Sequence, residues 1–393
     1  MSVPAPKQRL GDLAAFVSGG TPSKQIAAYW DGDTPWVSAK DLKSFRISSS
    51  IDTLSNEGRK VASLVPSETL LILVRGMSLF KSIPLGIATQ ELAINQDLKG
   101  LIAKGNVSAS FLAYSLLARE NALLQMVEAA GHGTGRLDTD ALKDFMVRVP
   151  PREEQEGIVD VLATWDTAIE RTEQLIALRA KQKAWLRAQV ISSLGHTTKL
   201  GDFLKQESRP EPKPTEPYWA LGIRSHGKGT FQRFVKDPAS VEMEELYAVN
   251  RDNLIVNITF AWEGAIAFVK PEDERCLVSH RFPTYEVNNE IADPVFVKYI
   301  VNCKAFFSKL ALISPGGAGR NRVLNKKDFL KLEVSLPPLA EQTRLAMILA
   351  TTDLLIEKET SLLVALKSQK RGLMQKLLTG QWRVPMENNE VPA

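Results

Sequence analysis

The chain has 393 residues, of which 44% are hydrophobic and 24% charged, and its formal net charge is +4. This length predicts two or three domains at roughly 150 residues each, and the composition is ordinary for a soluble globular protein. Two cysteines, Cys276 and Cys303, are too few for a disulfide framework or a metal cluster. The start MSVPAPKQRL lacks the apolar core of a signal peptide, and no apolar run approaches the ~18 residues of a spanning helix. We therefore expect a cytoplasmic protein with no membrane segment.

Charge is spread evenly along the chain. Residues 1–150 carry 16 Lys and Arg against 14 Asp and Glu, and residues 197–336 carry 20 against 18. Each segment thus has an excess of two positive charges. This small excess neither indicates nor excludes nucleic-acid binding, because the clustering of basic groups matters more than their sum.

The first 150 residues predict a mixed domain of short strands and a few helices. Short β-branched and aromatic runs alternate with Gly, Ser and Asn turns, as is typical of strands joined by loops. The segments with this pattern are SGGTPSK (18–24), TPWVSAKDLK (34–43), LILVRG (71–76) and NQDLKG (95–100). The glycine run AGHGTGR (130–136) lies before a further strand, where it suits either contact with a phosphate backbone or a plain connector.

A long helix is predicted after Pro150 and Pro151. Acidic residues at 153, 154 and 156 suit the positive end of a helix, and no Pro or Gly interrupts residues 158–193. Apolar residues recur there at spacings of three and four, which predicts a stripe that packs on another long helix. Residues 158–191 would span roughly 50 Å at ~1.5 Å per residue.

Residues 197–336 predict a second domain of the same kind. The segment KLGD (199–202) repeats RLGD (9–12), and a second glycine run, SPGGAGR, covers 314–320. Between them, strands and turns are expected in YWALGIRSHGKGTFQR (218–233), NITFAWEG (257–264) and VSHRFPTY (278–285). The loop within the first of these segments concentrates hydrogen-bond donors, which suit base edges or phosphates, although an ordinary solvated loop has the same composition.

A second long helix after Pro337 and Pro338 repeats the first at a constant offset of 187. In residues 150–191, 14 of 42 positions are identical to the position 187 residues later, among them Asp166/Asp353, Gln182/Gln369 and Lys183/Lys370. The predicted packing residues are Ile158, Leu162, Trp165, Ile169, Leu175 and Leu186 in the first helix and Leu345, Leu349, Ile356, Leu362 and Leu373 in the second. Two matched, unbroken helices predict an antiparallel pair. Gln182 and Gln369 either fix its register or face solvent.

The similarity continues upstream of the helices. The segment GRLDTDALKDF (135–145) parallels GRNRVLNKKDF (319–329), with three extra residues before the second Pro-Pro. The chain is therefore expected to be two units of one plan.

Motifs for catalysis are lacking in the sequence. Neither Pro-Pro site has the polar and aromatic neighbours of an amino-methyltransferase motif, and no Gly-Lys-Ser/Thr loop exists for a nucleotide-driven motor. The four histidines are scattered, without acidic or Cys companions at metal-ligand spacing. We expect no metal site and no catalytic residues in this chain.

The duplicated plan resembles the DNA specificity subunits of type I restriction-modification systems over essentially the whole chain. The resemblance rests on the two Pro-Pro-x-x-Glu-Gln helix starts, the LGD starts, PWVSAKDLK and NQDLKG in the first half, and LGIRSHGKGTF and NITFAWEGA in the second. The helix end LLTGQWRV (377–384) is also similar to that family. The repeated plan is far more specific than any one motif.

This resemblance implies an α+β fold with two globular target recognition domains separated by two long antiparallel helices, a coiled-coil spacer, in a pseudo-twofold repeat. The implied boundaries are recognition domains at 1–150 and 197–336, spacer helices at 151–196 and 337–384, and a tail at 385–393. Readers on one face of B-DNA sit roughly 34 to 36 Å apart, which a ~50 Å spacer reaches.

The resemblance also implies partners. Each domain would read one half of a split site in double-stranded DNA, and the helices would dock two modification subunits, which hold S-adenosylmethionine and flip the target adenine. Restriction subunits would add nuclease activity and translocation driven by ATP with Mg²⁺. The chain itself would be a non-catalytic subunit without a cofactor.

The resemblance does not identify base contacts, so candidates are chosen by chemistry and loop placement. They are Lys40, Lys43, Arg75, Arg224, Ser225, His226, Lys228, Arg281, Arg320 and Arg322. Two rival hypotheses remain: a coiled-coil scaffold that binds no DNA, and the specificity subunit of a fused restriction-methylation enzyme of another type.

Overall fold

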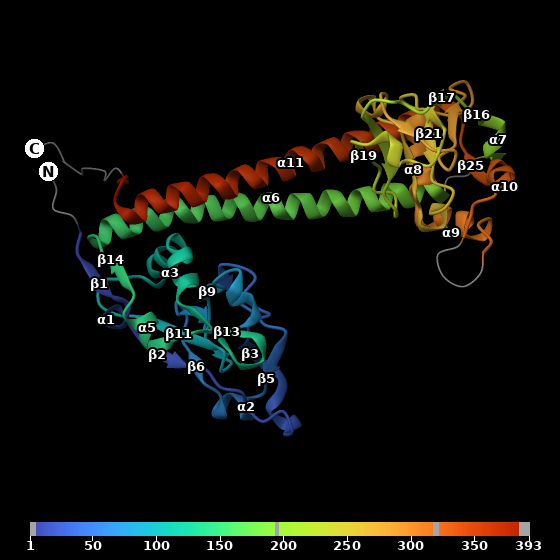
Figure 1. Ribbon diagram of the computed structural model, residues 1–393. Helices are drawn as coiled ribbons and strands as arrows, with labels where there is room; N and C mark the ends of the chain where they lie inside the picture. The colour runs from blue at the N-terminus through green and yellow to red at the C-terminus, as the bar shows by residue number, and fades with distance from the viewer. Residues whose placement is uncertain (1–4, 193–195, 317–321, 385–393) are drawn as a thin grey trace, which may run out of the picture. The chain divides into compact units, whose positions relative to one another are not determined.

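The protein is described by a computed structural model that covers residues 5–192, 196–316 and 322–384 (Figure 1). The chain forms two compact units, one made of residues 1–173 and 361–393 and the other of residues 174–360. The predicted tail 385–393 lies outside the described residues.

The first unit holds a globular domain around a five-stranded sheet of order β2-β11-β7-β9-β4. The central strand β7 (Leu70–Leu73) is buried at all four positions, which explains its uninterrupted apolar sequence. Further sheets have the orders β5-β3-β10-β6, β12-β13-β8 and β1-β14. The other strands are β1 (Lys7–Arg9), β2 (Ala14–Ser18), β3 (Trp30–Val37), β4 (Arg46–Ile47), β5 (Asp52–Leu54), β6 (Leu64–Val65), β8 (Arg75–Gly76), β9 (Leu85–Ala88), β10 (Leu92–Ile94), β11 (Leu98–Ala103), β12 (Val127–Ala130), β13 (Thr134–Leu137) and β14 (Met146–Arg148).

Five helices and three 3-10 turns complete this domain. They are α1 (Leu10–Leu13), α2 (Asn56–Val61), α3 (Ala109–Ala118), α4 (Glu120–Gln125) and α5 (Thr139–Lys143), with η1 (Ala27–Tyr29), η2 (Met77–Phe80) and η3 (Gly131–Gly133). Helix α3 has a Ser108 cap whose side chain accepts from the Phe111 amide, and its buried side chains join the core of the five-stranded sheet.

The second unit holds a globular domain with sheets of order β16-β24-β21-β22, β17-β20-β23-β18-β19 and β15-β25. Its strands are β15 (His196–Lys199), β16 (Leu204–Glu207), β17 (Pro210–Pro212), β18 (Tyr218–Ile223), β19 (Thr230–Val235), β20 (Glu245–Ala248), β21 (Leu254–Val256), β22 (Ile266–Phe268), β23 (Leu277–Val278), β24 (Thr284–Val287) and β25 (Glu333–Leu336). The helices and turns are α7 (Leu200–Phe203), α8 (Pro294–Val301), α9 (Lys304–Leu312), α10 (Lys326–Lys331), η4 (Pro238–Ser240), η5 (Ala261–Glu263) and η6 (Pro271–Asp273).

The two long helices match residue for residue. Helices α6 (Arg152–Ser192) and α11 (Leu339–Thr379) have 41 residues each, or about 60 Å. Both ends of α11 lie 187 residues after those of α6 (339 − 152 = 187 and 379 − 192 = 187). Each helix begins directly after its Pro-Pro pair, because proline lacks an N–H but its carbonyl still accepts from the helix. The helix predicted after Pro150 and Pro151 thus begins at Arg152.

One sheet order recurs in the two globular domains. Strands β2-β11-β7-β9 of the first domain correspond to β16-β24-β21-β22 of the second. The helices before the Pro-Pro pairs correspond too: α5 starts after the side-chain cap Asp138 and α10 after Asn325, at the same offset of 187. The alignment of 135–145 with 319–329 was therefore wrong by three residues, because the matching glycine-arginine pairs drew the segments out of register.

Within each unit the long helices run antiparallel. Ion pairs join them, among them Asp166–Lys370 and Glu173–Lys367 in the first unit and Arg179–Glu359 and Lys183–Asp353 in the second. Residue numbers rise along α6 as they fall along α11, as an antiparallel pair requires. The expected fold class, two globular α+β domains and two long antiparallel helices in an internal repeat, is confirmed.

The predicted apolar stripe packs mainly at the helix ends. Ile158 and Leu162 join the core of the first unit, and Leu349 joins that of the second. Leu186, Leu345 and Leu373 are partly buried against these cores, and Trp165, Ile169 and Ile356 are half-buried.

Two stripe residues depart from the expectation. Leu175 and Leu362 are 41% and 51% exposed, so their predicted packing was wrong in this structure. The ion pair Arg179–Glu359 joins the two helices nearby. Gln182 and Gln369 are exposed, which corresponds to the solvent-facing alternative.

No helix among the described residues is both long enough and apolar enough to span a membrane.

Candidate nucleic-acid interface

Several loops of the first domain meet at one end of its central sheet. The Asn95 amide donates to the Val37 carbonyl at 2.9 Å, and the Val74 amide donates to the Asp97 carbonyl at 2.8 Å. In turn the Leu137 amide donates to the Val74 carbonyl at 2.9 Å. Residues 38–45, 74–81, 95–97 and 131–136 are therefore named the first loop cluster.

The first loop cluster carries three of the predicted DNA-binding residues. Lys40, Lys43 and Arg75 are all exposed, and none of their side chains has a hydrogen bond or ion pair within the described parts of the chain. Arg75 lies opposite Arg136 in the β8–β13 pair, and Arg136 is bound to Asp138 at 3.0 Å. Unpaired, exposed cations on one set of loops can meet phosphates or guanine edges without first breaking an internal bond.

The second domain has a matching group of loops. The His226 amide donates to the Glu263 carbonyl at 2.7 Å, and the Ile258 amide donates to the Arg281 carbonyl at 3.0 Å. The Leu324 amide donates to the Ile258 carbonyl at 2.8 Å. Residues 224–229, 257–264, 279–282, 314–316 and 322–324 are named the second loop cluster.

The turn 224–229 depends on glycine. Gly227 has φ of +65°, and a side chain there would meet the Asn302 amide oxygen at 2.8 Å. The preceding His226 also has a positive φ of 63°, which places it in the left-handed region without a glycine. A close approach of this turn to the α8–α9 connection thus fixes its shape.

The donors of the second loop cluster divide into free and occupied groups. His226, Lys228 and Arg281 are exposed, and their side chains form no hydrogen bond or ion pair with any described residue. The Ser225 hydroxyl donates to Glu263 at 2.8 Å. Arg224 donates to the Thr230 carbonyl at 2.9 Å.

Arg322 is more deeply engaged than its sequence context suggests. Its guanidinium donates to the Ser314 and Ala311 carbonyls at 3.1 and 3.2 Å and lies 5.3 Å from the centre of the Trp262 ring. These bonds make Arg322 a brace of the loop rather than a free donor. Arg320 lies outside the described residues.

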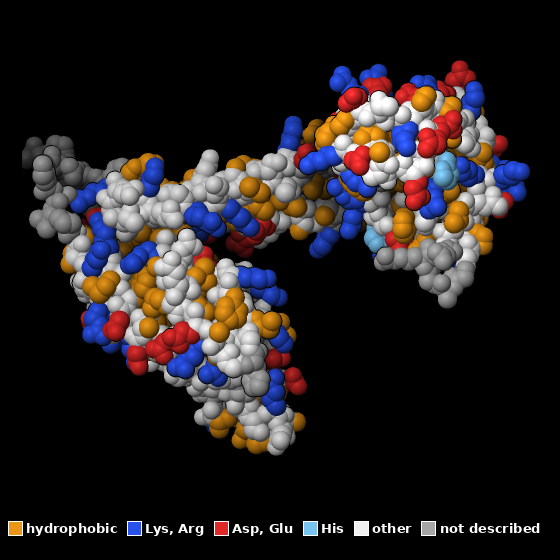
Figure 2. Space-filling view, in the orientation of Figure 1, with side chains coloured by type: hydrophobic (Ala, Val, Ile, Leu, Met, Phe, Trp, Pro, Cys, Tyr) orange, Lys and Arg blue, Asp and Glu red, His pale blue; other side chains and the backbone are white. Residues whose placement is uncertain are grey.

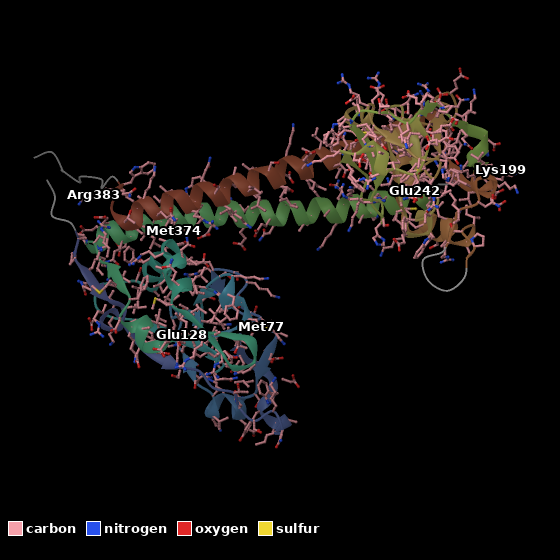
Figure 3. The ribbon with its side chains drawn as sticks, in the orientation of Figure 1. Met77, Glu128, Lys199, Glu242, Met374 and Arg383 are labelled. Atoms are coloured by element: carbon pink, nitrogen blue, oxygen red, sulfur yellow. The ribbon has the colours of Figure 1, made fainter. Side chains whose placement is uncertain are left out.

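Sequence reasoning missed two exposed apolar side chains beside Arg75. Met77 and Phe80 are 74% and 52% exposed in η2, and Figure 3 shows Met77 on the first domain. The sequence signal for Met77 is the RGM (75–77) that directly follows the buried run LLILV (70–74). An apolar residue past the end of that run has no core to enter.

Positive and negative side chains are mixed on the face of the molecule that Figure 2 shows. In the view of Figure 2, Lys and Arg side chains are interspersed with Asp and Glu on each globular part rather than gathered in one basic face.

Metal-ligating side chains do not cluster among the described residues. No group of three or more His, Cys, Asp or Glu side chains there has metal-binding placement. Burial, with a smaller contribution from Asp273, raises the pKa of the Cys276 thiol to about 11, which keeps it protonated and a poor nucleophile.

The comparisons with known proteins agree with this architecture. The family model described as type I restriction modification DNA specificity domain matches residues 6–178 and 194–368. The specificity subunit of the Escherichia coli type I restriction enzyme EcoR124I/EcoR124II is 30% identical over 190 residues, which are 47% of each chain. The MjaIX specificity subunit of Methanocaldococcus jannaschii is 29% identical over 171 residues, 42% of this chain and 38% of that protein. The matched segments thus span about half or less of these relatives.

Solved structures show the same fold. The S subunit of a type I restriction-modification system from M. genitalium matches with a TM-score of 0.58 at 13% identity over 96% of both chains. A chain from a structure on complex assembly and conformational transition of the type I R-M system matches with a TM-score of 0.53 at 14% identity over 97% of this chain and 99% of that one. With its two matched segments and their shared fold, the chain belongs to the type I restriction-modification DNA specificity family.

Proposed function

We propose that this chain is the non-catalytic subunit that reads a split DNA target and directs adenine methylation and restriction by partner subunits. The supporting observation is the repeat: two globular domains place equivalent loop clusters at the same end of the same sheet order. A molecule with two equivalent readers suits a target with two half-sites.

The proposed recognition domains are residues 1–150 and 197–336, and the proposed spacer helices are residues 151–196 and 337–384. Lys40, Lys43 and Arg75 would read the first half-site. Arg224, Ser225, His226, Lys228, Arg281 and Arg320 would read the second, with Arg322 holding the loop that presents them. Arginine suits a guanine edge, and lysine suits phosphate.

The proposed partners follow from the family to which the chain belongs. Two modification subunits with S-adenosylmethionine would supply methylation, and restriction subunits with ATP and Mg²⁺ would supply cleavage. Exposed apolar residues along the helices, such as Leu178 and Trp185, offer surface for these subunits. We propose that the protein acts in the cytoplasm, where the DNA that it would read is found.

Co-expression with the neighbouring modification subunit in a host without adenine methylation tests the proposal. Sequencing for methylated adenines should find a split motif with a fixed gap. If both proteins are soluble and associated but no new methylation appears, the scaffold hypothesis gains support. A single neighbouring gene that encodes nuclease and methyltransferase together would favour a fused enzyme of another type.

A further inference from the structure

Each globular domain is tied to both long helices by a polar contact that a buried tyrosine makes with an aspartate. In the first unit the Tyr114 hydroxyl of α3 donates to Asp166 of α6 at 2.7 Å, and the other oxygen of Asp166 accepts from Lys370 of α11. These three residues are named the first clamp. Tyr114 is 1% exposed, and the Lys370 and Asp166 side chains are 13% and 29% exposed, so the contact is partly shielded from water.

The second unit contains the same contact. The Tyr299 hydroxyl of α8 donates to Asp353 of α11 at 2.8 Å, and Asp353 forms an ion pair with Lys183 of α6. These residues are named the second clamp. Tyr299 is 8% exposed, and the Lys183 and Asp353 side chains are 27% and 40% exposed.

The clamps are related by the internal repeat, with their lysines exchanged. Asp353 is the counterpart of Asp166 (166 + 187 = 353), and Lys370 is the counterpart of Lys183 (183 + 187 = 370). Lys183, which follows the first domain in the sequence, thus belongs to the second clamp. Lys370, near the end of the chain, belongs to the first. Because the exchange is reciprocal, sliding one helix along the other would break both clamps together.

A polar clamp suits register better than an apolar contact. Apolar side chains tolerate a shift with little loss, whereas a partly shielded carboxylate loses both its cation and the hydroxyl of a buried tyrosine, at a cost that is larger in the first clamp, where the aspartate is less exposed. Burial, and then the hydrogen bond to the aspartate, raise the pKa of Tyr114 and of Tyr299 above the ordinary range, so both hydroxyls remain donors. In the first clamp, Lys370 also lies over the Tyr114 ring, 5.1 Å from its centre.

We infer that the two clamps are positioning devices that hold each globular domain at one place on the helix pair, with crossed control: Lys370 positions the first domain and Lys183 positions the second. This inference rests on the proposed function only where it concerns DNA. If each domain reads a half-site, the clamps keep the two readers in one register and so restrict the gap between half-sites.

Hydrogen exchange on the full chain tests the crossed control without DNA. Lys370→Met should accelerate exchange in α3 by about fivefold or more and leave α8 unchanged, and Lys183→Met should do the reverse. Lys367→Met is the matched control, because Lys367 pairs with Glu173 while both side chains are about half exposed; it should change neither helix. Unchanged exchange in both lysine variants, or faster exchange in the wrong domain, would overturn the inference.

A second experiment uses the complex with the modification subunit. Methylation is measured on DNA with the native gap and with the gap one base pair longer or shorter. The preference for the native gap should fall by about fivefold or more in the Lys370→Met and Lys183→Met double variant and persist in Lys367→Met. Should either lysine variant fail to fold, Tyr114→Phe and Tyr299→Phe remove only a hydroxyl and should change the same readouts in the same domains.

Failure of the inference and failure of the proposed function give different results. If the wild-type complex methylates no DNA but the lysine variants show the crossed pattern of hydrogen exchange, the proposed function is contradicted. The clamps then remain positioning devices. Wild-type complex with a fixed gap, whose double variant keeps the same gap preference, contradicts the inference alone.

Discussion

Arg148 lies on the last strand before α6 and pairs with Glu154 at 2.8 Å, with side chains 12% and 9% exposed. The same place before α11 is Ser335, and the matching Glu341 instead pairs with Arg344 on the surface. Elsewhere the frame is equivalent: Leu10 and Leu200 are fully buried, and the two long helices match end to end. The buried core positions and the long helices were therefore kept after the duplication, while single contacts and loops diverged.

The largest expected difference between the halves is at Arg148. Arg148→Met leaves Glu154 as a buried carboxylate without its cation and should lower the free energy of unfolding of the first unit by about 3 to 4 kcal/mol. Arg152→Met is the control, because Arg152 pairs with Glu156 on the surface, and it should cost about 0 to 1 kcal/mol. Denaturant titration measures both, and equal losses would show that burial of the Arg148 pair contributes nothing.

Each long helix has a buried glutamine near its start, and the two glutamines differ in their hydrogen bonds. Gln155 donates to the Pro150 and Asn106 carbonyls, and Gln342 donates to the Pro337 and Ile291 carbonyls. The Gln342 side-chain oxygen also accepts a bond from the Asp293 amide at 3.0 Å, whereas the Gln155 side-chain oxygen is buried without a partner among the described residues.

The volume-conserving change Gln342→Leu should therefore cost about 2 to 3 kcal/mol, and Gln155→Leu about 1 kcal/mol less. Thermal or denaturant unfolding of the full chain provides the measurement. A larger loss for Gln155→Leu would contradict this account of the helix starts.

The loop clusters predict half-site effects of similar or smaller size. Arg75→Ala should weaken recognition of the first half-site only, and Arg281→Ala and Arg224→Ala the second only, each by about 1 to 3 kcal/mol if the side chain pairs with a base. Competition binding by the complex, with changes in one half-site at a time, measures the effect. Unchanged affinity and specificity in a variant would remove that residue from the interface.

The smallest expected difference between the halves is in the response of their helices α5 and α10 to low pH. Asp138 caps α5, and the amides of Ala141 and Asp140 lower the pKa of its carboxyl, whereas its counterpart Asn325 does not titrate. Because the folded pKa lies below the unfolded value of about 3.9, the capping contribution is complete above that pH and is lost as pH falls through the folded pKa.

Hydrogen exchange between pH 5 and pH 3 should accordingly show α5 loosening more than α10. Asp138→Asn should remove the difference. Equal acid sensitivity of the two helices in the unaltered chain would contradict this explanation.

Periodicity, Pro-Pro pairs and the constant offset predict the long helices, the duplication and the fold class, because these features depend on local chemistry that repeats. The same patterns do not reveal which polar residues meet across the fold. Lys183 and Asp166 were visible as identities between repeats, yet their partners are Asp353, Tyr114 and Lys370 on other elements. Likewise Arg322 resembles a free DNA-binding arginine in sequence and proves to be a loop brace, since its acceptors are carbonyls that only the fold brings near.

The assignment of one half-site to each domain is tested by an exchange of residues 1–150 for the corresponding domain of a relative with a different target. The chimeric chain is expressed with the modification subunit in a host without adenine methylation, and methylated adenines are mapped. We expect one half of the motif to change while the other half and the gap stay the same. Change of both halves, or an unchanged motif, would contradict the assignment of one half-site to each domain.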